Sequence, residues 1–166
     1  MATMGTTALV LASQPSSAIV GLIDAGQDPD AKVYPGDMAV ARNGDVRFSN
    51  GSVYNASSTA YATVELPIIN DDLGRGISKS YVYVVDRNPV ANITCRLNTL
   101  YWNNTHDQFY GYWGSSRSTV GSSGNQGTLT MGSATHGSTR HEFITCTLPP
   151  RYYGNASYII SYKIEE

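Results

Sequence analysis

The residues best suited to chemistry lie in one aromatic stretch, residues 101–113, which reads YWNNTHDQFYGYW. Asn103 and Asn104 separate two aromatic arms, a pattern typical of a β-hairpin. Aromatic rings that reach solvent can stack on sugar rings, while nearby amides and carboxylates bind sugar hydroxyls. The stretch therefore predicts a glycan-binding site, with candidate residues Trp102, Asn104, Asp107, Tyr110, Tyr112 and Trp113.

Strand alternation decides which of these rings share a face. It places Tyr110 and Tyr112 on one face of the second arm, and Phe109 and Trp113 on the other. If one face packs on the core, the other shows aromatic rings to water. The alternative is cross-strand aromatic pairing without a ligand, worth roughly 0.2–1 kcal/mol per pair. The sequence leaves both interpretations open.

Aspartates gather in two predicted loops, at Asp24, Asp28 and Asp30 and again at Asp71 and Asp72. Calcium binds six to eight hard oxygen ligands, which extracellular modules often supply from such loops. Aspartate is also a common turn residue because its side chain bonds to the backbone nearby, and the spacing matches no EF-hand. Turn chemistry is the expected role, with calcium as the alternative and no other cofactor.

Catalytic motifs are missing from the sequence. His106, His136 and His141 are the only candidates for a base near neutral pH, and they belong to no G-x-S-x-G or H-E-x-x-H motif. Serine and aspartate are too common here for their presence beside a histidine to indicate a triad. We therefore expect that the protein is not an enzyme.

Both cysteines lie in the same local pattern, since residues 93–97 and 144–148 both read I-T-C-x-L. In each segment alternation turns the isoleucine, cysteine and leucine to one face, so both sulfur atoms point into the apolar layer. We expect a disulfide between Cys95 and Cys146, and the alternative is two buried thiols. No C-x-x-C spacing indicates a redox or metal role.

Composition and periodicity predict an all-β protein. Only 14% of the residues are charged, the net charge is −2, and no basic cluster is present, which argues against nucleic acid as a partner. Period-two alternation recurs along the chain, no apolar run is long enough to span a membrane, and no signal peptide is recognisable. We expect a single domain over residues 1–166, an antiparallel two-sheet β-sandwich or jelly roll with one disulfide.

Two local expectations concern turns and loops. Asn43-Gly44 predicts a hairpin between strands at 38–42 and 46–48, because a type I′ turn needs positive φ at both central residues. The stretch 114–127, rich in glycine and serine, predicts a long loop.

The N-terminal segment, residues 1–23, carries no charge. Its strand candidate comprises Thr6, Thr7, Ala8, Leu9, Val10 and Leu11. This strand either belongs to the protein's own sheet or adds to a neighbouring subunit through main-chain hydrogen bonds. The second arrangement would make the protein a self-assembling subunit of a polymer or filament.

Three segments resemble small uncharacterised secreted proteins of proteobacteria. They are residues 55–68, which include NASSTAYATV and LPI, residues 145–150, TCTLPP, and residues 160–165, ISYKIE. The resemblance spans about residues 45–166 and implies export and an all-β fold, but no activity. Those proteins usually carry a further cysteine pair, where this chain has Ser13 and Leu66.

Together these features predict a secreted or cell-surface protein without catalytic activity. The leading interpretation is a structural subunit that partners with itself, because the uncharged N-terminal segment covers more residues than the aromatic hairpin does. The alternative is a lectin-like module that binds a surface glycan through residues 101–113.

Overall fold

Side chains alternate between buried and exposed along most strands, as in β5 (Ala62–Pro67) and β6 (Lys79–Val85). The computed structural model describes residues 30–69, 71, 76–103, 105–121, 124, 126–134 and 140–166. The other elements are β1 (Lys32–Pro35), the 3₁₀ helix η1 (Gly36–Met38), β2 (Val40–Asn43), β3 (Val46–Ser49), β4 (Ser52–Asn55), β7 (Thr94–Asn103), β8 (Gln108–Trp113), β9 (Arg117–Ser118), β10 (Gln126–Met131), β11 (Arg140–Leu148) and β12 (Tyr158–Glu165).

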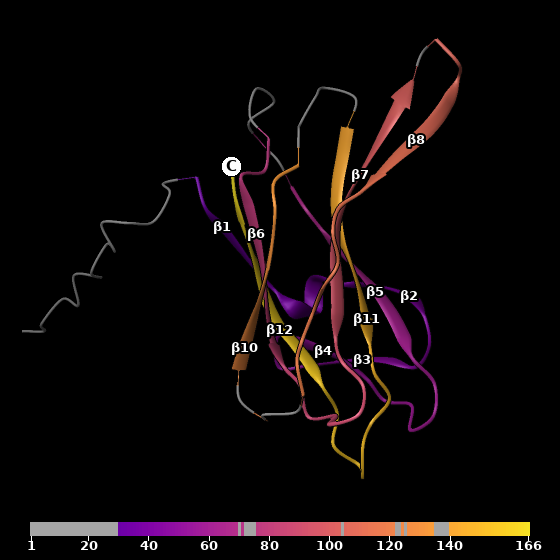
Figure 1. Ribbon diagram of the computed structural model, residues 1–166, viewed down its shortest axis with the longest axis vertical. Helices are drawn as coiled ribbons and strands as arrows, with labels where there is room; N and C mark the ends of the chain where they lie inside the picture. The colour runs from indigo at the N-terminus through magenta and orange to yellow at the C-terminus, as the bar shows by residue number, and fades with distance from the viewer. Residues whose placement is uncertain are drawn as a thin grey trace, which may run out of the picture.

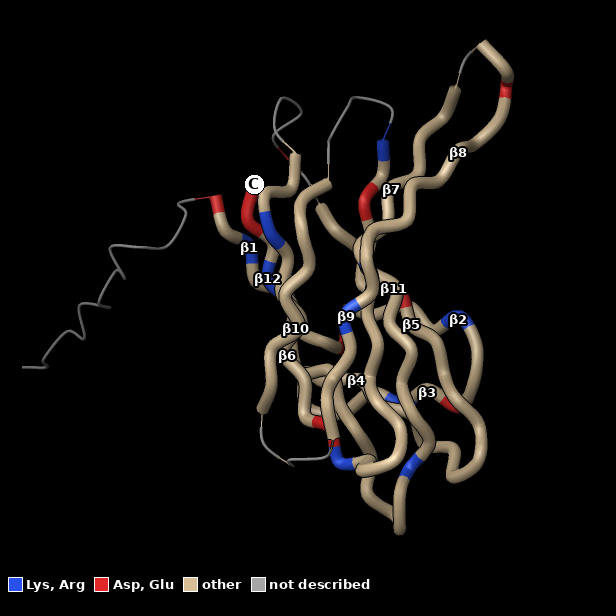
Figure 2. Tube along the Cα trace, viewed as in Figure 1, with Lys and Arg blue, Asp and Glu red and all other residues tan. Residues whose placement is uncertain are grey.

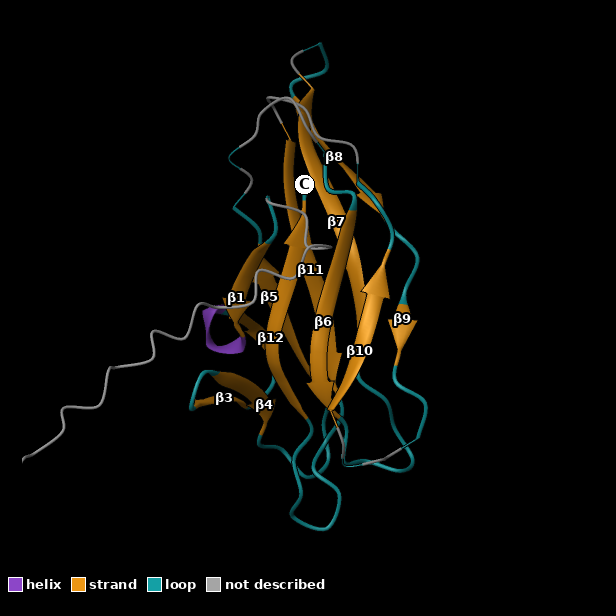
Figure 3. Ribbon diagram, turned by 90° about the vertical axis from the view of Figure 1, so that its left-hand side faces the viewer, coloured by secondary structure: helices purple, strands orange, loops and turns teal. Residues whose placement is uncertain are grey.

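These strands form two antiparallel sheets that face each other, which confirms the predicted β-sandwich (Figures 1 and 3). Sheet A has the order β10-β6-β12-β4-β3, with β1 also paired to β12. Sheet B has the order β2-β5-β11-β7-β8, with β9 also paired to β7. No helix in the described part of the chain is long and apolar enough to span a membrane.

The core fills the space between the sheets, and the predicted disulfide lies within it. Cys95 and Cys146 are directly opposite in the β7–β11 ladder and are joined by a disulfide bond. Both are fully buried, as are Ile93, Ile144 and Leu148. The inward faces predicted from the two I-T-C-x-L segments are therefore confirmed, with Leu97 only 4% exposed.

The predicted hairpin at Asn43-Gly44 is wrong. β2 pairs with β5 in sheet B, whereas β3 pairs with β4 in sheet A, so Asn43-Gly44 carries the chain from one sheet to the other. The true tight hairpin is at Asn50-Gly51, where both residues have positive φ and Ser49 pairs with Ser52. An Asn-Gly pair indicates the backbone conformation of a turn, but not which strand the next segment joins.

The stretch 114–127 is not a single long loop. Arg117 and Ser118 form β9, which pairs with Thr94 and Cys95 on the edge of β7 that β8 leaves open. The N–H of Gly114 donates to the carbonyl oxygen of Leu97 at 2.9 Å and so continues the edge between β8 and β9. A Cβ at Gly114 would lie 2.7 Å from that oxygen, so glycine permits the close approach.

The hairpin of β7 and β8 projects beyond the sandwich, at the end of the molecule where the C-terminus lies (Figures 1 and 3). β11 accompanies β7 only as far as Arg140, which is opposite Tyr101. The outer part of the hairpin therefore has solvent beside it. It contains Trp102 and Phe109 of the aromatic stretch, whereas Trp113 is opposite Asn98, in the part that β11 accompanies.

The predicted strand at 6–11 lies outside the described residues. This includes the strand-exchange candidates, so the self-assembling subunit stays a prediction.

Candidate functional site: the projecting aromatic hairpin

The β7–β8 ladder fixes which aromatic side chains share a face. Tyr101 is opposite Tyr110 and Trp102 is opposite Phe109, and opposite residues of an antiparallel pair lie on the same face. Since Cys95 and Leu97 of β7 point into the core, Tyr101 and its partners lie on the inner face. Trp102 and its partners lie on the outer face of sheet B.

The outer face of the hairpin is an exposed aromatic platform, defined here by Leu100, Trp102, Phe109 and Trp113. Phe109 is 70% exposed and Trp113 is 58% exposed. Trp102 packs edge-on against Phe109, with ring centroids 4.7 Å apart. Outward side chains on other strands of this sheet include Thr63, Glu65 and Thr147, together with Val40, which is 47% exposed. The exposed rings of Phe109 and Trp113 are on the hairpin.

Gly111 provides the space in which the Trp113 ring lies. A Cβ at this position would come within 3.2 Å of both Trp113 Cζ2 and Leu100 Cδ2. A side chain at position 111 would therefore displace the indole from the strand surface. The glycine lets the ring lie close over β8, with part of its surface open to solvent.

A chain of contacts holds Trp113 in place. The guanidinium carbon of Arg96 is 4.8 Å from the centroid of the Trp113 ring, a cation–π contact. Arg96 Nε donates a hydrogen bond to Asn98 Oδ1 at 3.1 Å, and Asn98 Nδ2 donates to Thr145 Oγ1 at 2.8 Å. Because Asn98 is 1% exposed and lies opposite Trp113, this anchor is shielded from water. The exposed indole is thus oriented before any ligand arrives.

The inner face carries three stacked tyrosines. The ring centroid of Tyr101 lies 5.4 Å from that of Tyr110 and 5.5 Å from that of Tyr112, with nearly parallel planes. A hydrogen bond with Tyr112, together with burial, raises the pKa of Tyr101. Tyr101 stacks on both other rings, whereas Tyr112 stays 60% exposed, so this stack combines cross-strand packing with one tyrosine ring that is open to solvent.

A cleft of about 520 Å³ opens between the two sheets, next to the base of the hairpin. Its lining includes Tyr112, Trp113 and Arg117 from the sheet B side and Met131 and Ser133 from the sheet A side. Arg117 spans the opening, since its Nε donates to the carbonyl oxygen of Thr130 at 3.2 Å. Trp113 thus borders both the outer platform and the cleft.

The structure separates the glycan-binding candidates into two groups. Trp102 and Trp113 belong to the outer platform, whereas Tyr110 and Tyr112 belong to the inner stack. Asp107 is exposed in the turn that joins the strands, with φ of 51°, and Asn104 lies outside the described residues. The separation follows the alternation predicted for Tyr110, Tyr112, Phe109 and Trp113.

Sequence reasoning missed three polar residues of this region: Arg96, Asn98 and Arg117. A signal existed for Arg96 and Asn98, because the alternation that turns Cys95 and Leu97 inward turns their neighbours outward. No local signal could find Arg117, because its position depends on the pairing of β9 with β7.

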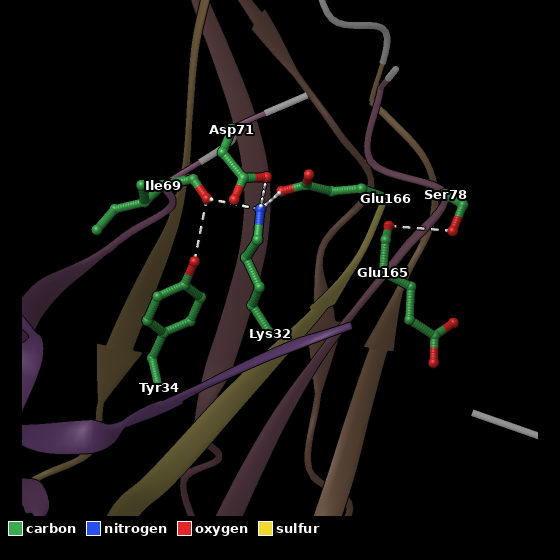
Figure 4. A network of polar contacts seen from close by, with 7 residues as sticks. All are labelled: Lys32, Tyr34, Ile69, Asp71, Ser78, Glu165 and Glu166. Carbon is green, nitrogen blue, oxygen red and sulfur yellow. Dashed lines mark hydrogen bonds and ion pairs between the residues drawn. The ribbon is translucent and has the colours of Figure 1, made fainter. Parts of the chain in front are cut away.

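Of the five calcium candidates, Asp30 and Asp71 are among the described residues. Asp24, Asp28 and Asp72 lie outside them. Asp71 forms an ion pair with the ammonium group of Lys32, which also lies 2.7 Å from Glu166 Oε1 (Figure 4). The cation beside Asp71 is therefore a lysine. Among the described residues no group of three or more histidine, cysteine, aspartate or glutamate side chains could hold a metal ion.

No protein-family model matches this sequence, and the comparison with curated proteins gave no match. Among solved structures, the chain is similar to the CBM36-1 domain of a multidomain xylanase from the hindgut metagenome of Trinervitermes trinervoides. That likeness has a TM-score of 0.48 and 11% identity, and it covers 82% of this chain and 97% of the other.

Two other solved structures are also similar to this chain. One is the CBM22-1–GH10 part of the Clostridium thermocellum xylanase 10B, with a TM-score of 0.49, 14% identity and coverage of 80% of this chain and 27% of the other. The second is the low-affinity xylan-binding module CBM86 of Roseburia intestinalis, with a TM-score of 0.42, 14% identity and coverage of 81% and 94%. Because all three TM-scores are below 0.5, a function for this chain has to come from its own side chains.

Proposed function

We propose that this protein is an extracellular glycan-binding module that holds a sugar chain on the outer platform of its β7–β8 hairpin. The observation that carries the proposal is the anchored, half-exposed ring of Trp113. Exposed apolar surface on a projecting hairpin costs solvation free energy, and a patch of this kind commonly marks a binding surface.

The chemistry around the ring favours a sugar. A pyranose has one apolar face of C–H groups, which stacks on an indole, and a rim of hydroxyls, which needs donors and acceptors. Trp113 supplies the flat surface, and the free N–H groups of the Arg96 guanidinium supply donors at its edge. Phe109 and Trp102 extend the platform toward the tip, where further sugar units would lie.

The proposed role is binding without cleavage. Glycoside hydrolysis ordinarily uses two carboxyl groups that flank the scissile bond. The polar groups described around Trp113 are instead a guanidinium, an amide and a hydroxyl, from Arg96, Asn98 and Thr145. These groups bind and orient a sugar, and they do not provide a carboxylic acid that donates a proton.

A glycan microarray followed by calorimetry tests the proposal, with Trp113→Ala as the key variant. We expect Trp113→Ala to weaken binding at least tenfold without lowering the melting temperature by more than a few degrees. Tyr153→Ala is the matched control, because Tyr153 is an exposed aromatic residue, at 87%, in the turn that follows β11. That turn lies at the end of β11 opposite to the hairpin, so the control should bind like the wild type.

Two results would contradict the proposal. One is that the wild type retains no glycan at all, and the other is that Trp113→Ala binds as tightly as the wild type. If the wild type releases reducing ends from a bound polysaccharide, the proposal that the protein binds sugars without cleaving them is overturned.

A further inference from the structure

Two arginines lie near Trp113 on opposite faces of sheet B, and neither has a carboxylate partner among the described residues. Arg96 shares the outer face with Trp113, whereas Arg117 is opposite Cys95 and therefore lies on the inner face. Arg96 stacks on the indole, and Arg117 lines the cleft that Trp113 borders. In both, Nε is used for an anchoring hydrogen bond within the protein, to Asn98 in one case and to Thr130 in the other. The terminal Nη groups of both arginines have no acceptor in the described structure.

Two other arginines of this chain are neutralised by carboxylates. Arg42 forms an ion pair with Glu65, and Arg47 lies 2.9 Å from the carboxylate of Asp45. A guanidinium held by Nε presents its two remaining nitrogen atoms as a planar fork, which matches a carboxylate or sulfate group. Arg96 and Arg117 therefore differ from Arg42 and Arg47, because their Nε atoms are anchored within the protein and their Nη atoms are free.

The nearest negative charge of the hairpin is at its far tip. Between Arg96 and Arg117 the sequence contains one charged residue, Asp107, and Figure 2 shows the projecting hairpin almost free of charge. Trp113 pairs with Asn98, whereas the tip begins beyond the pair of Asn103 and Gln108, five positions further on. At about 3.4 Å per residue this is roughly 17 Å, beyond the screening length of about 8 Å at physiological salt.

We propose that the glycan bound at Trp113 is anionic, with a carboxylate or sulfate group that binds the free end of Arg96. This inference rests on the proposed function and names the chemical class of the sugar. In a complex the anionic group would accept hydrogen bonds from the Nη groups, while the sugar ring stacks on the indole. Although the whole chain has a net charge of −2, its binding surface would be locally positive.

Matched polymers test the inference on the wild-type protein without any substitution. Polygalacturonic acid is compared with its carboxyl-reduced form, and dextran sulfate with dextran, by calorimetry at 50 mM and 300 mM NaCl. We expect at least one acidic polymer to bind about tenfold more tightly than its neutral counterpart at low salt, and to lose most of that advantage at high salt. The polymer that shows the advantage identifies a carboxylate or a sulfate as the recognised group.

Substitutions then locate the charge recognition. Arg96→Gln should reduce the acidic preference several-fold, and Arg96→Lys should keep only part of it because lysine lacks the planar fork. The matched control is Arg87→Gln, since Arg87 lies over the ring of Tyr158 in sheet A, 5.5 Å from its centroid, and should have no effect. The comparison of polymers on the wild-type protein keeps the test valid if a variant fails to fold.

Equal affinity for the acidic and neutral polymers would overturn the inference and leave the proposed function standing. The same holds if Arg96→Gln keeps the acidic preference. Absence of binding to every polymer and every arrayed glycan would instead overturn the proposed function itself.

Discussion

Arg96 and Asn98 hold each other in a closed pair of hydrogen bonds. Arg96 Nε donates to Asn98 Oδ1 at 3.1 Å, and Asn98 Nδ2 donates back to the backbone carbonyl oxygen of Arg96 at 3.2 Å. Both side chains leave β7 on the outer face, two residues apart, so the pair fixes the guanidinium against the strand. The orientation of Trp113 therefore depends on an amide that a ligand does not need to touch.

Asn98→Ala should loosen Trp113 without removing a binding group. We expect a three- to tenfold loss of glycan affinity and faster acrylamide quenching of Trp113, measured in a Trp102→Phe background where it is the only tryptophan. Asn98→Asp keeps the acceptor for Arg96 Nε and should restore most of both properties. If quenching is unchanged in Asn98→Ala, Asn98 is not a positioning residue.

Replacement of both Cys95 and Cys146 by alanine should lower the free energy of unfolding by about 4 kcal/mol. The disulfide joins residues 51 positions apart, and a cross-link over such a loop restricts the unfolded chain by about this amount. Urea unfolding of the oxidised wild type and the double variant measures the difference. A loss below about 1 kcal/mol would show that strand pairing alone sets the stability of this region.

Burial raises the pKa of the Tyr162 phenol, whose hydroxyl donates to the carbonyl oxygen of Pro67 at 2.6 Å. Because the folded pKa is above the unfolded value of 10.0, this stabilisation is complete below pH 10 and is lost as the pH rises further. Tyr162→Phe should be about 1–2 kcal/mol less stable at pH 7, because it leaves the Pro67 oxygen unpaired. Unfolding curves from pH 7 to pH 11 should show this gap narrowing above pH 10, and a constant gap would contradict the assignment.

Lys32→Met should destabilise the protein by roughly 2 kcal/mol, because it leaves the carboxylate of Glu166 buried without its cation. The Glu166 side chain is 1% exposed, and Lys32 also lowers the pKa of Asp71 through a hydrogen bond. Since the folded pKa of Asp71 is below its unfolded value, the contribution of Asp71 to the stability of the folded state is present above about pH 4 and is lost as the pH falls. The stability of Lys32→Met should therefore change less than that of the wild type as the pH falls below about pH 4.

Thermal unfolding from pH 3 to pH 7 checks this, with the exposed Lys79→Met as control. The same unfolding measured in calcium and in EGTA should give one melting temperature for the wild type if Lys32 is the only cation of this cluster. A calcium-dependent shift would indicate a site that involves Asp24, Asp28 or Asp72.

The predicted strand exchange is testable by removal of residues 1–29 and measurement of the solution mass. If the N-terminal segment adds to a neighbour, the full chain should form oligomers that the shortened chain does not form. If the full chain and the shortened chain are both monomers, self-assembly through this segment is ruled out. Glycan binding by the shortened chain should be unchanged, because every residue of the platform lies beyond position 95.

Local periodicity explains what the sequence predicted well. A strand presents its side chains alternately to two faces whatever its neighbours are, so inward Cys95 and Cys146 and the opposite faces of Tyr112 and Trp113 could be read from spacing alone. The sandwich and the disulfide followed from the same alternation. The aromatic hairpin was found because its two arms are adjacent in sequence.

Tertiary structure decided which strands became neighbours, and spacing does not encode that choice. Asn43-Gly44 and Asn50-Gly51 are the same dipeptide, yet one crosses between sheets and the other closes a hairpin, because β2 pairs with β5 whereas β3 pairs with β4. Likewise, Arg117 lies near Trp113 only because β9 pairs along the open edge of β7. The sequence by itself thus determined the faces of the strands and the residues of the hairpin. The three-dimensional pairing of strands determined which polar groups surround Trp113, since hydrogen-bonded edges form between segments far apart in the chain.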